Sequence, residues 1–442
     1  MGAELVIVIG AGAAGLSAAE RLAAKGVRVE VIEARKRIGG RIFTVRPKGM
    51  ALPLELGAEF VHGRAPATVG LIDRSGAVAY DVPFEHMRRE HGRLKGIPAY
   101  EKVLEKELAG LADVGRRDVS FRDYLRGQPG GTRTAAARQA LDFVRGFDAA
   151  DPDQASAKAL AEEQESVGAM DQTQSRLLQG YGELMEFLYR ELWRRGVAVH
   201  VGHPVVHVSW KRRQVAVRCA GDKAQFRGTR AVVTLPAGVL ATRPPARGAV
   251  RFDPEVPALR AGLEHTATGP VVKVLLVFRE RFWEDPAFAR RAKAGEELAN
   301  ASFLHEMSAP IPVWWTARPL RLPVLTGWAG GPKAAALAGL SRENLERTAL
   351  QSLGRLFGVS AASLRRQLRD MLFHDWPADP FARGAYSYLT VDGMGSRELL
   401  STPAEGTLFF AGEASDISGE ASTVAGAIAG GQRAADQILK RM

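Results

Sequence analysis

Three glycines and one carboxylate near the N-terminus form the most informative pattern of this 442-residue chain. An apolar run is followed at once by the glycines, which are Gly10, Gly12 and Gly15. In this order the glycines permit a tight turn, let the backbone approach a pyrophosphate, and let the next helix pack closely while its N-terminus attracts phosphate. Glu33 ends the next predicted strand, where a carboxylate accepts hydrogen bonds from a ribose and repels a 2′-phosphate. The pattern predicts a dinucleotide site; the alternative is a glycine-rich turn without a ligand.

Two arginines and a second glycine pair follow this carboxylate closely. Arg35 and Arg41 are suited to neutralise phosphate through charge-assisted hydrogen bonds. Gly39 and Gly40 leave room for the backbone to lie against an extended cofactor. The alternative is a basic loop in contact with solvent.

A single lysine interrupts an apolar run later in the chain. Lys273 is the only charge within residues 271–278. Burying an ammonium group is costly and tends to lower its pKa, so a lysine in this place needs a reason. Because the run alternates weakly, the alternative is a half-exposed strand with Lys273 facing solvent.

Composition limits the function classes. The length favours two domains, and the 46% of hydrophobic residues is typical of a soluble globular protein. The net charge of +11 comes mainly from scattered arginines without interleaved aromatic residues, so we expect no nucleic-acid partner. The single cysteine, Cys219, excludes an intrachain disulfide and fits a cytoplasmic location. No apolar run has the length of a membrane span and no signal peptide is recognisable, so no membrane partner is expected.

The order of predicted elements indicates an α/β protein with a discontinuous N-terminal domain. Residues 87–195 have a helical pattern, short strands follow over 197–236, and the apolar segment 408–413 is predicted to return to the first sheet. We therefore expect a Rossmann-like dinucleotide-binding domain with an inserted mixed α+β substrate domain. The expected boundaries are 1–80, 197–250 and 391–442 for the first domain, and 81–196 and 251–390 for the second.

The chain resembles the flavin-containing amine oxidase superfamily, which includes monoamine oxidases, polyamine oxidases and flavin-type histone lysine demethylases. Five stretches carry the resemblance, and they are residues 10–15, 33–41, 55–63, 376–388 and 410–431. The resemblance implies oxidation of an amine to an imine by FAD, with oxygen reduced to hydrogen peroxide. It implies a small-molecule amine and oxygen as partners and gives no indication of a metal or of an oligomeric state.

The resemblance also implies which residues contact the cofactor. They are Gly10, Gly12, Ala14, Gly15, Glu33, Ala34, Arg35, Gly40, Arg41, Leu56, Gly57, Ala58, Glu59, Val205, Trp376, Gly412, Glu413, Thr423, Val424 and Ala427. In the family, the backbone at Val205 meets the adenine, and the N–H groups of Thr423 and Val424 face the flavin O2. Ala385 stands where monoamine oxidases carry the cysteine that is bonded to FAD, so non-covalent FAD is expected.

Four residues are implied to act at the reacting centre. Lys273 corresponds to the lysine that holds a water against flavin N5, and Trp376 to a tryptophan that packs beside the flavin. Tyr386 corresponds to one wall of an aromatic cage for the amine. His62 lies where polyamine oxidases often have a histidine in the substrate channel. The alternatives are a structural histidine and ordinary core aromatic residues.

The sequence departs from the family where the second wall of the cage is expected. Residues 420–423 contain no aromatic side chain, and Glu420 is present instead. Glu59 and Glu420 are therefore candidate substrate carboxylates, which favours a polyamine or another polar amine. The alternatives are an L-amino acid oxidase, for which no arginine clamp is recognisable, a flavin-dependent desaturase, a chromatin demethylase, and a non-catalytic FAD-binding protein.

Overall fold

The computed structural model describes residues 4–63, 65–97, 117–168, 173–221 and 225–442. Part of the helical region expected over 87–195 lies outside these described residues. The chain divides into two compact units. Unit 1 contains residues 1–80, 158–268 and 379–442, and unit 2 contains residues 81–157 and 269–378.

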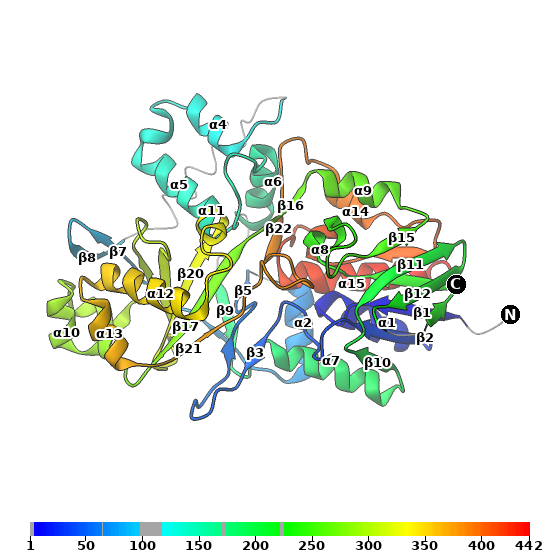
Figure 1. The fold of residues 1–442 in the computed structure, drawn as a ribbon, viewed down its shortest axis with the longest axis horizontal. Coiled ribbons are helices and arrows are strands. Elements are labelled where there is room, and N and C mark those ends of the chain that lie inside the picture. Colours follow the sequence, from blue (N-terminus) through cyan, green and yellow to red (C-terminus); the bar gives the residue numbers. More distant parts are fainter. Residues whose placement is uncertain (1–3, 64, 98–116, 169–172, 222–224) are drawn as a thin grey trace. The chain divides into compact units, whose positions relative to one another are not determined.

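Unit 1 is built on a five-stranded parallel sheet (Figure 1). Its strands, in spatial order, are β10 (Ala198–Val201), β2 (Arg28–Glu33), β1 (Leu5–Ile9), β14 (Arg230–Val233) and β23 (Leu408–Phe410). The central strand β1 is apolar on both faces and almost fully buried, as expected for a parallel strand covered on both sides. Strand β23 pairs with β14 beside β1, which confirms that the C-terminal segment returns to the first sheet.

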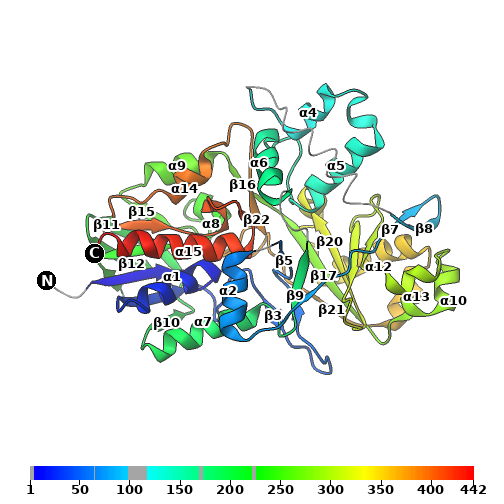
Figure 2. The ribbon, with the colours of Figure 1, turned by 180° about the vertical axis from the view of Figure 1, so that it is seen from behind.

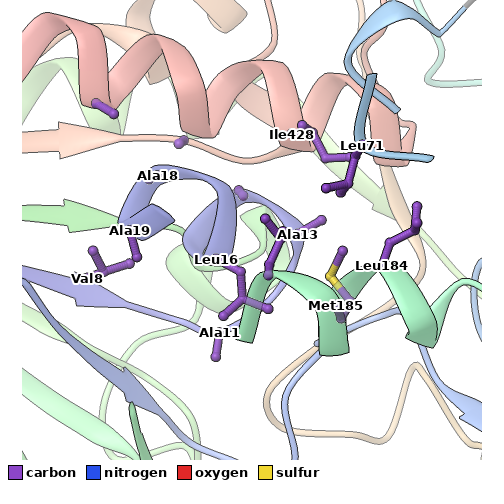
Figure 3. Packing of buried hydrophobic residues seen from close by; sticks show 14 of the residues in the cluster. Val8, Ala11, Ala13, Leu16, Ala18, Ala19, Leu71, Leu184, Met185 and Ile428 are labelled. Carbon is purple, nitrogen blue, oxygen red and sulfur yellow. The ribbon is translucent and has the colours of Figure 1, made fainter. Parts of the chain in front are cut away.

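Helices cover one face of this sheet, and a second sheet covers the other. The helices are α1 (Ala13–Ala23), α2 (Pro66–Ser75), α7 (Gly182–Arg194) and α15 (Val424–Leu439), and α15 lies alongside α1 in Figure 2. Their shared core includes Leu16, Leu71, Leu184 and Ile428 (Figure 3). A Cβ atom at Gly431 would lie 2.2 Å from the backbone oxygen of Ala14, so α15 packs closely only with glycine there.

The second sheet of unit 1 has four strands. They are β13 (Gln225–Gly228), β12 (Gln214–Cys219), β11 (Val205–Lys211) and β15 (Arg251–Asp253). Short helices complete this side, namely α8 (Ala237–Ala241), α9 (Pro257–Glu264) and α14 (Ser396–Ser401). Several short strands pair outside these sheets. Strand β3 (Thr44–Val45) pairs with β4 (Leu54–Glu55), and β5 (Val61–His62) pairs with β9 (Gln174–Leu177). Strand β16 (Thr266–Gly269) pairs with β22 (Tyr386–Leu389).

Unit 2 contains a seven-stranded sheet. Its spatial order is β21 (Leu368–Phe373), β17 (Val271–Phe278), β20 (Val324–Gly330), β19 (Val313–Thr316), β18 (Phe303–His305), β7 (His86–Glu90) and β8 (Arg93–Gly96). Alternate residues of β17 contribute to an apolar core that also includes residues of α10 (Pro286–Arg291), α12 (Arg342–Phe357) and α13 (Ala361–Gln367). Helices α4 (Phe121–Gly127) and α5 (Ala135–Gly146) belong to the same unit.

The expected domain boundaries agree with the two units at one position only. The boundary after residue 80 coincides, whereas the other changes of unit occur after residues 157, 268 and 378. Helix α7 belongs to unit 1 because its apolar face packs in the core of α1. The helical pattern expected from residue 87 is wrong at its start, because β7 and β8 form a hairpin whose strand β7 pairs with β18.

None of the described helices is long and apolar enough to cross a membrane.

Candidate flavin and amine site

The glycine turn after β1 brings backbone segments into close contact. A Cβ atom at Gly15 would lie 1.8 Å from the backbone oxygen of Gly10, and Gly10 itself has a φ of +111°. The fold therefore requires glycine at both positions. At Gly12 a Cβ atom would meet nothing nearer than backbone atoms 3.9 Å away. The fold itself therefore tolerates a Cβ atom at Gly12, which is the N-cap of α1, and a helix N-terminus is a position that suits a phosphate group.

Glu33 closes this turn from the end of β2. The side chain is 4% exposed. Its Oε2 accepts a hydrogen bond from the Ala11 N–H and its Oε1 accepts one from the Arg35 N–H, both at 2.8 Å. An ionised carboxylate accepts about four hydrogen bonds, so acceptor sites remain for ribose hydroxyls.

The two arginines predicted at the phosphates each pair with a carboxylate of unit 1. Arg35 Nη2 lies 2.9 Å from Asp379 Oδ2. Arg41 Nη1 lies 2.8 Å from Glu413 Oε1 and donates to the Ala385 carbonyl at 2.5 Å. Both guanidinium charges are thus balanced by carboxylates of unit 1, and their contacts with phosphate stay a prediction.

Two further segments lie beside this turn. The Gly39 N–H donates to the Ala11 carbonyl at 2.8 Å, which brings the second glycine pair, including Gly40, to the first. The His203 N–H donates to the Glu33 carbonyl at 2.8 Å, so Val205 begins β11 close to the end of β2. Gly40 and Val205 thus lie in segments that are hydrogen-bonded to the turn and to the end of β2, and their contacts with a cofactor stay predictions.

The segment from Leu56 to Glu59 runs against the backbone of Arg41. A Cβ atom at Gly57 would lie 1.9 Å from the Arg41 carbonyl oxygen, and the Ala58 N–H donates to the same oxygen at 3.2 Å. Glycine at this position is therefore required by the close approach of two backbones.

Glu59 forms a largely buried ion pair with Arg176 of β9. Arg176 Nε lies 2.7 Å from Glu59 Oε1, and the Arg176 guanidinium lies 4.6 Å from the centre of the Phe60 ring. Tyr80 lies close to this pair, and burial raises the pKa of its hydroxyl to about 12. The carboxylate of Glu59 is thus already balanced by a cation within unit 1.

His62 and Glu420 also belong to unit 1. Burial lowers the pKa of His62 to about 4, so its imidazole is neutral at pH 7. Burial, with a smaller contribution from Asp416, raises the pKa of the Glu420 carboxyl above its usual value. Burial is the main cause of the raised pKa of Tyr181, and the charges of Glu55 and Glu420 raise it further.

The C-terminal segment supplies open backbone and a helix N-terminus. Gly412 has a φ of +138°, and a Cβ atom there would have no neighbour within 4 Å. Thr423 is the N-cap of α15, and its side chain accepts a hydrogen bond from the Gly426 N–H at 3.1 Å. Val424 is the first helical residue, and Ala427 follows one turn later.

A pocket in unit 1 contains residues that the sequence analysis missed. It is lined by Arg41, Gly412 and Glu413 and also by Leu235 and Pro236. Leu235 and Pro236 follow β14, whose carboxyl end lies at the same edge of the parallel sheet as that of β1. Ligands of parallel sheets bind at the carboxyl ends of the strands. The position of Leu235 and Pro236 directly after β14 could therefore have indicated that they lie at this edge.

Lys273 and Trp376 belong to unit 2, and Tyr386 belongs to unit 1. Lys273 is 2% exposed, which contradicts the solvent-facing alternative, and its Nζ lies 5.7 Å from the centre of the Trp315 ring. Trp376 is 3% exposed and packs edge-to-face on His374 at 4.3 Å. Tyr386 begins β22, directly after Ala385.

Three comparisons place the chain among known proteins. The sequence profile of the family described as "Flavin containing amine oxidoreductase" matches residues 13–439. Polyamine oxidase 3 of Oryza sativa subsp. japonica is 26% identical, over 99% of this chain and 89% of the relative. Lysine-specific histone demethylase 1 homolog 3 of Arabidopsis thaliana is 25% identical over 98% of this chain, which spans 30% of the relative's length.

Solved structures share the fold along the whole chain. Putrescine oxidase, solved as the wild type bound to putrescine, has a TM-score of 0.80 at 23% identity, covering 99% of both chains. Cyclohexylamine oxidase from Brevibacterium oxydans IH-35A has a TM-score of 0.79 at 20% identity, again covering 99% of both chains. The predicted α/β class with a Rossmann-like domain is confirmed, and the chain belongs to the family of flavin-containing amine oxidoreductases.

Proposed function

We propose that the chain binds FAD without a covalent bond and oxidises a small amine that carries a second positive charge, with oxygen as the electron acceptor and hydrogen peroxide as a product. The family supports a flavin and an amine substrate. The observation that carries the cofactor proposal is the glycine turn that leads into α1, with Gly12 at its N-cap, beside the buried carboxylate of Glu33. A bound flavin would supply the acceptor for a hydride from the carbon next to the amine nitrogen.

Unit 1 is proposed to hold the cofactor. The phosphates lie at Gly12 and the N-terminus of α1, the ribose at Glu33, and the adenine at the backbone of Val205. Leu56–Glu59, Gly412, Glu413 and the first turn of α15 contact the remainder. Ala385 offers no thiol, and Cys219 is buried in β12, so the flavin stays dissociable.

The chain's own contribution to the reaction is positioning and charge. Tyr386 presents a ring face to the ammonium or amine, and Trp376 packs beside the flavin. The neutral imidazole of His62 is an acceptor for an amine N–H. Lys273 holds a water for reoxidation, which its burial in β17 next to Trp315 supports.

Glu420 is proposed to recognise the second positive charge. Glu59 is the weaker candidate because Arg176 already neutralises it. A distal ammonium favours the ionised form of Glu420 and thereby offsets the raised pKa of this carboxyl. The names of the relatives agree with this class, since they include polyamine oxidases and putrescine oxidase. The buried single cysteine suits a reducing compartment, so the cytoplasm remains the proposed location.

A peroxide-release assay across four substrate groups tests the proposal. The groups are diamines, longer polyamines, monoamines of the benzylamine type, and L-amino acids. Diamines or polyamines are expected to give the highest kcat/KM. Faster turnover of benzylamine would contradict the second-charge proposal, and faster turnover of an L-amino acid would support the alternative oxidase.

A precipitation experiment tests the mode of cofactor binding. The purified protein is expected to be yellow and to release its flavin into the supernatant after acid precipitation. Flavin that stays in the pellet would contradict non-covalent binding. The substitution Gly12→Val should abolish flavin binding, because a valine side chain at the N-cap of α1 would lie where the pyrophosphate is proposed to bind, whereas the fold itself has room for a Cβ atom there.

A further inference from the structure

A serine in the strand that carries Tyr386 forms hydrogen bonds to the side chain of Glu413. Ser387 is 3% exposed. Its Oγ donates to Glu413 Oε2 at 2.6 Å, and its N–H donates to the same oxygen at 3.2 Å. Hydrogen bonds to an ionised carboxylate are stronger than neutral ones, so Ser387 is held firmly.

The same carboxylate holds the residue on the other side of Tyr386 through Arg41. Glu413 Oε1 pairs with Arg41 Nη1 at 2.8 Å, and this nitrogen donates to the Ala385 carbonyl at 2.5 Å. Glu413 therefore restrains both chain neighbours of Tyr386, one directly and one through a cation.

A second serine fastens the strand to the start of α15. Ser422 Oγ donates to the Ser387 carbonyl at 2.6 Å. Ser422 has a φ of +65° and directly precedes Thr423, the N-cap of α15. A serine adopts this left-handed conformation when its surroundings hold it there. Its hydroxyl thus connects the helix start to β22.

These contacts fix the direction of the Tyr386 side chain. Successive side chains of a strand point to opposite faces, so the Ser387 hydroxyl on Glu413 requires the Tyr386 ring to point away from Glu413. A strand rotated about its axis would break the contacts of both Ser387 and Ser422. The network contains two serines to which the family resemblance gave no role.

We propose that Ser387 and Ser422 are positioning residues. Their hydrogen bonds hold the Tyr386 strand against the proposed flavin-binding residues Glu413 and Thr423, and thereby orient the Tyr386 ring toward the amine. This inference rests on the proposed function, because it assigns Tyr386 to the amine site. The competing explanation is that Ser387 serves only to satisfy the buried carboxylate of Glu413.

Hydrogen exchange of the flavin-loaded protein, followed by mass spectrometry, tests the fastening without any substrate. In Ser387→Ala and in Ser422→Ala, the peptide covering residues 384–390 is expected to exchange about tenfold faster, the effect of losing one strong hydrogen bond. The matched control is Ser401→Ala, a buried serine of unit 1 whose hydroxyl donates to the Glu398 carbonyl. Exchange that is equally slow in Ser387→Ala, Ser422→Ala and the control would overturn the inference.

Steady-state kinetics then test the consequence for the amine. In Ser387→Ala, KM for the best amine is expected to rise about tenfold with a smaller change in kcat and an unchanged flavin content. Ser387→Thr keeps a hydroxyl and should restore the KM. In a Tyr386→Leu background, Ser387→Ala should raise KM no further.

The outcomes separate this inference from the proposed function. A wild type that oxidises no amine contradicts the proposed function, and the exchange experiment still decides whether the serines fasten the strand. A wild type that oxidises amines, together with an equal KM in Ser387→Ala and Ser401→Ala, overturns the positioning role alone. Additive effects of Ser387→Ala and Tyr386→Leu on KM would also overturn it. If Ser387→Ala does not fold, Ser422→Ala tests the same inference, because it removes the other side-chain hydrogen bond to the Tyr386 strand.

Discussion

Replacing Glu33 by glutamine removes one charge and one acceptor from the centre of the proposed ribose site. The carboxylate now accepts two backbone hydrogen bonds at 2.8 Å, from Ala11 and from Arg35. A glutamine side chain has one oxygen, so its amide group would face one of these two N–H donors. A hydrogen bond to a charged group contributes about 1.5–3 kcal/mol, and one such bond is lost.

Glu30→Gln on the same strand is the matched control. Glu30 lies 3.5 Å from His200 Nε2, and both side chains are about one-third exposed. A pair of this kind contributes under about 1 kcal/mol. The two variants therefore make the same chemical change on β2, at the buried Glu33 and at the partly exposed Glu30.

Urea unfolding of the flavin-free protein and flavin titration measure the two consequences. Glu33→Gln is expected to lower the free energy of unfolding by about 1.5–3 kcal/mol and to weaken flavin binding at least about tenfold. Glu30→Gln should change both quantities little. If Glu33→Gln lost no more stability and no more flavin affinity than Glu30→Gln, the assignment of Glu33 to the ribose site would be wrong.

Three further predictions concern the amine and pH. Lys273→Met should slow reoxidation of the reduced flavin by oxygen in stopped-flow experiments and affect anaerobic reduction less; equal oxygen reactivity would refute the role of Lys273. Glu420→Gln should remove a preference of about tenfold to hundredfold for diamines over monoamines of equal length. In the wild type, the preference for diamines should decrease as pH falls through the raised pKa of Glu420, because the carboxylate becomes protonated. A preference for diamines that survives in Glu420→Gln would show that Glu420 does not recognise the second positive charge. Burial lowers the pKa of both His62 and His86 to about 4. Since the unfolded chain takes up these protons near pH 6.5 and the folded chain does not, the free energy of unfolding should decrease as pH falls from about 6.5 to about 4. Urea unfolding at pH 7 and pH 5 checks this, and equal values would contradict it.

Local patterns predicted the dinucleotide-binding part of the fold well. Strand β1, the glycine turn, helix α1 and Glu33 at the end of β2 are contiguous in sequence, and each follows from glycine conformation and apolar patterning. The return of the apolar strand β23 to the same sheet was also predictable, because a fully apolar strand needs cover on both faces.

The partners of the charged residues were not predictable from the sequence. Arg35 pairs with Asp379, and Arg41 pairs with Glu413, although each partner lies more than three hundred residues along the chain. No local pattern marks such contacts, so the sequence analysis predicted phosphate contacts for both arginines without their carboxylate partners. The pairing of β7 with the distant strand β18 was not predictable for the same reason.

The most direct test of the central claim is anaerobic mixing of the flavin-loaded protein with putrescine, spermidine, benzylamine or an L-amino acid, followed by flavin absorbance. We predict that a diamine or polyamine reduces the flavin and bleaches its visible band in a concentration-dependent way. Benzylamine should do so more slowly at equal concentration. Flavin that stays oxidised with every amine of the panel would contradict the account.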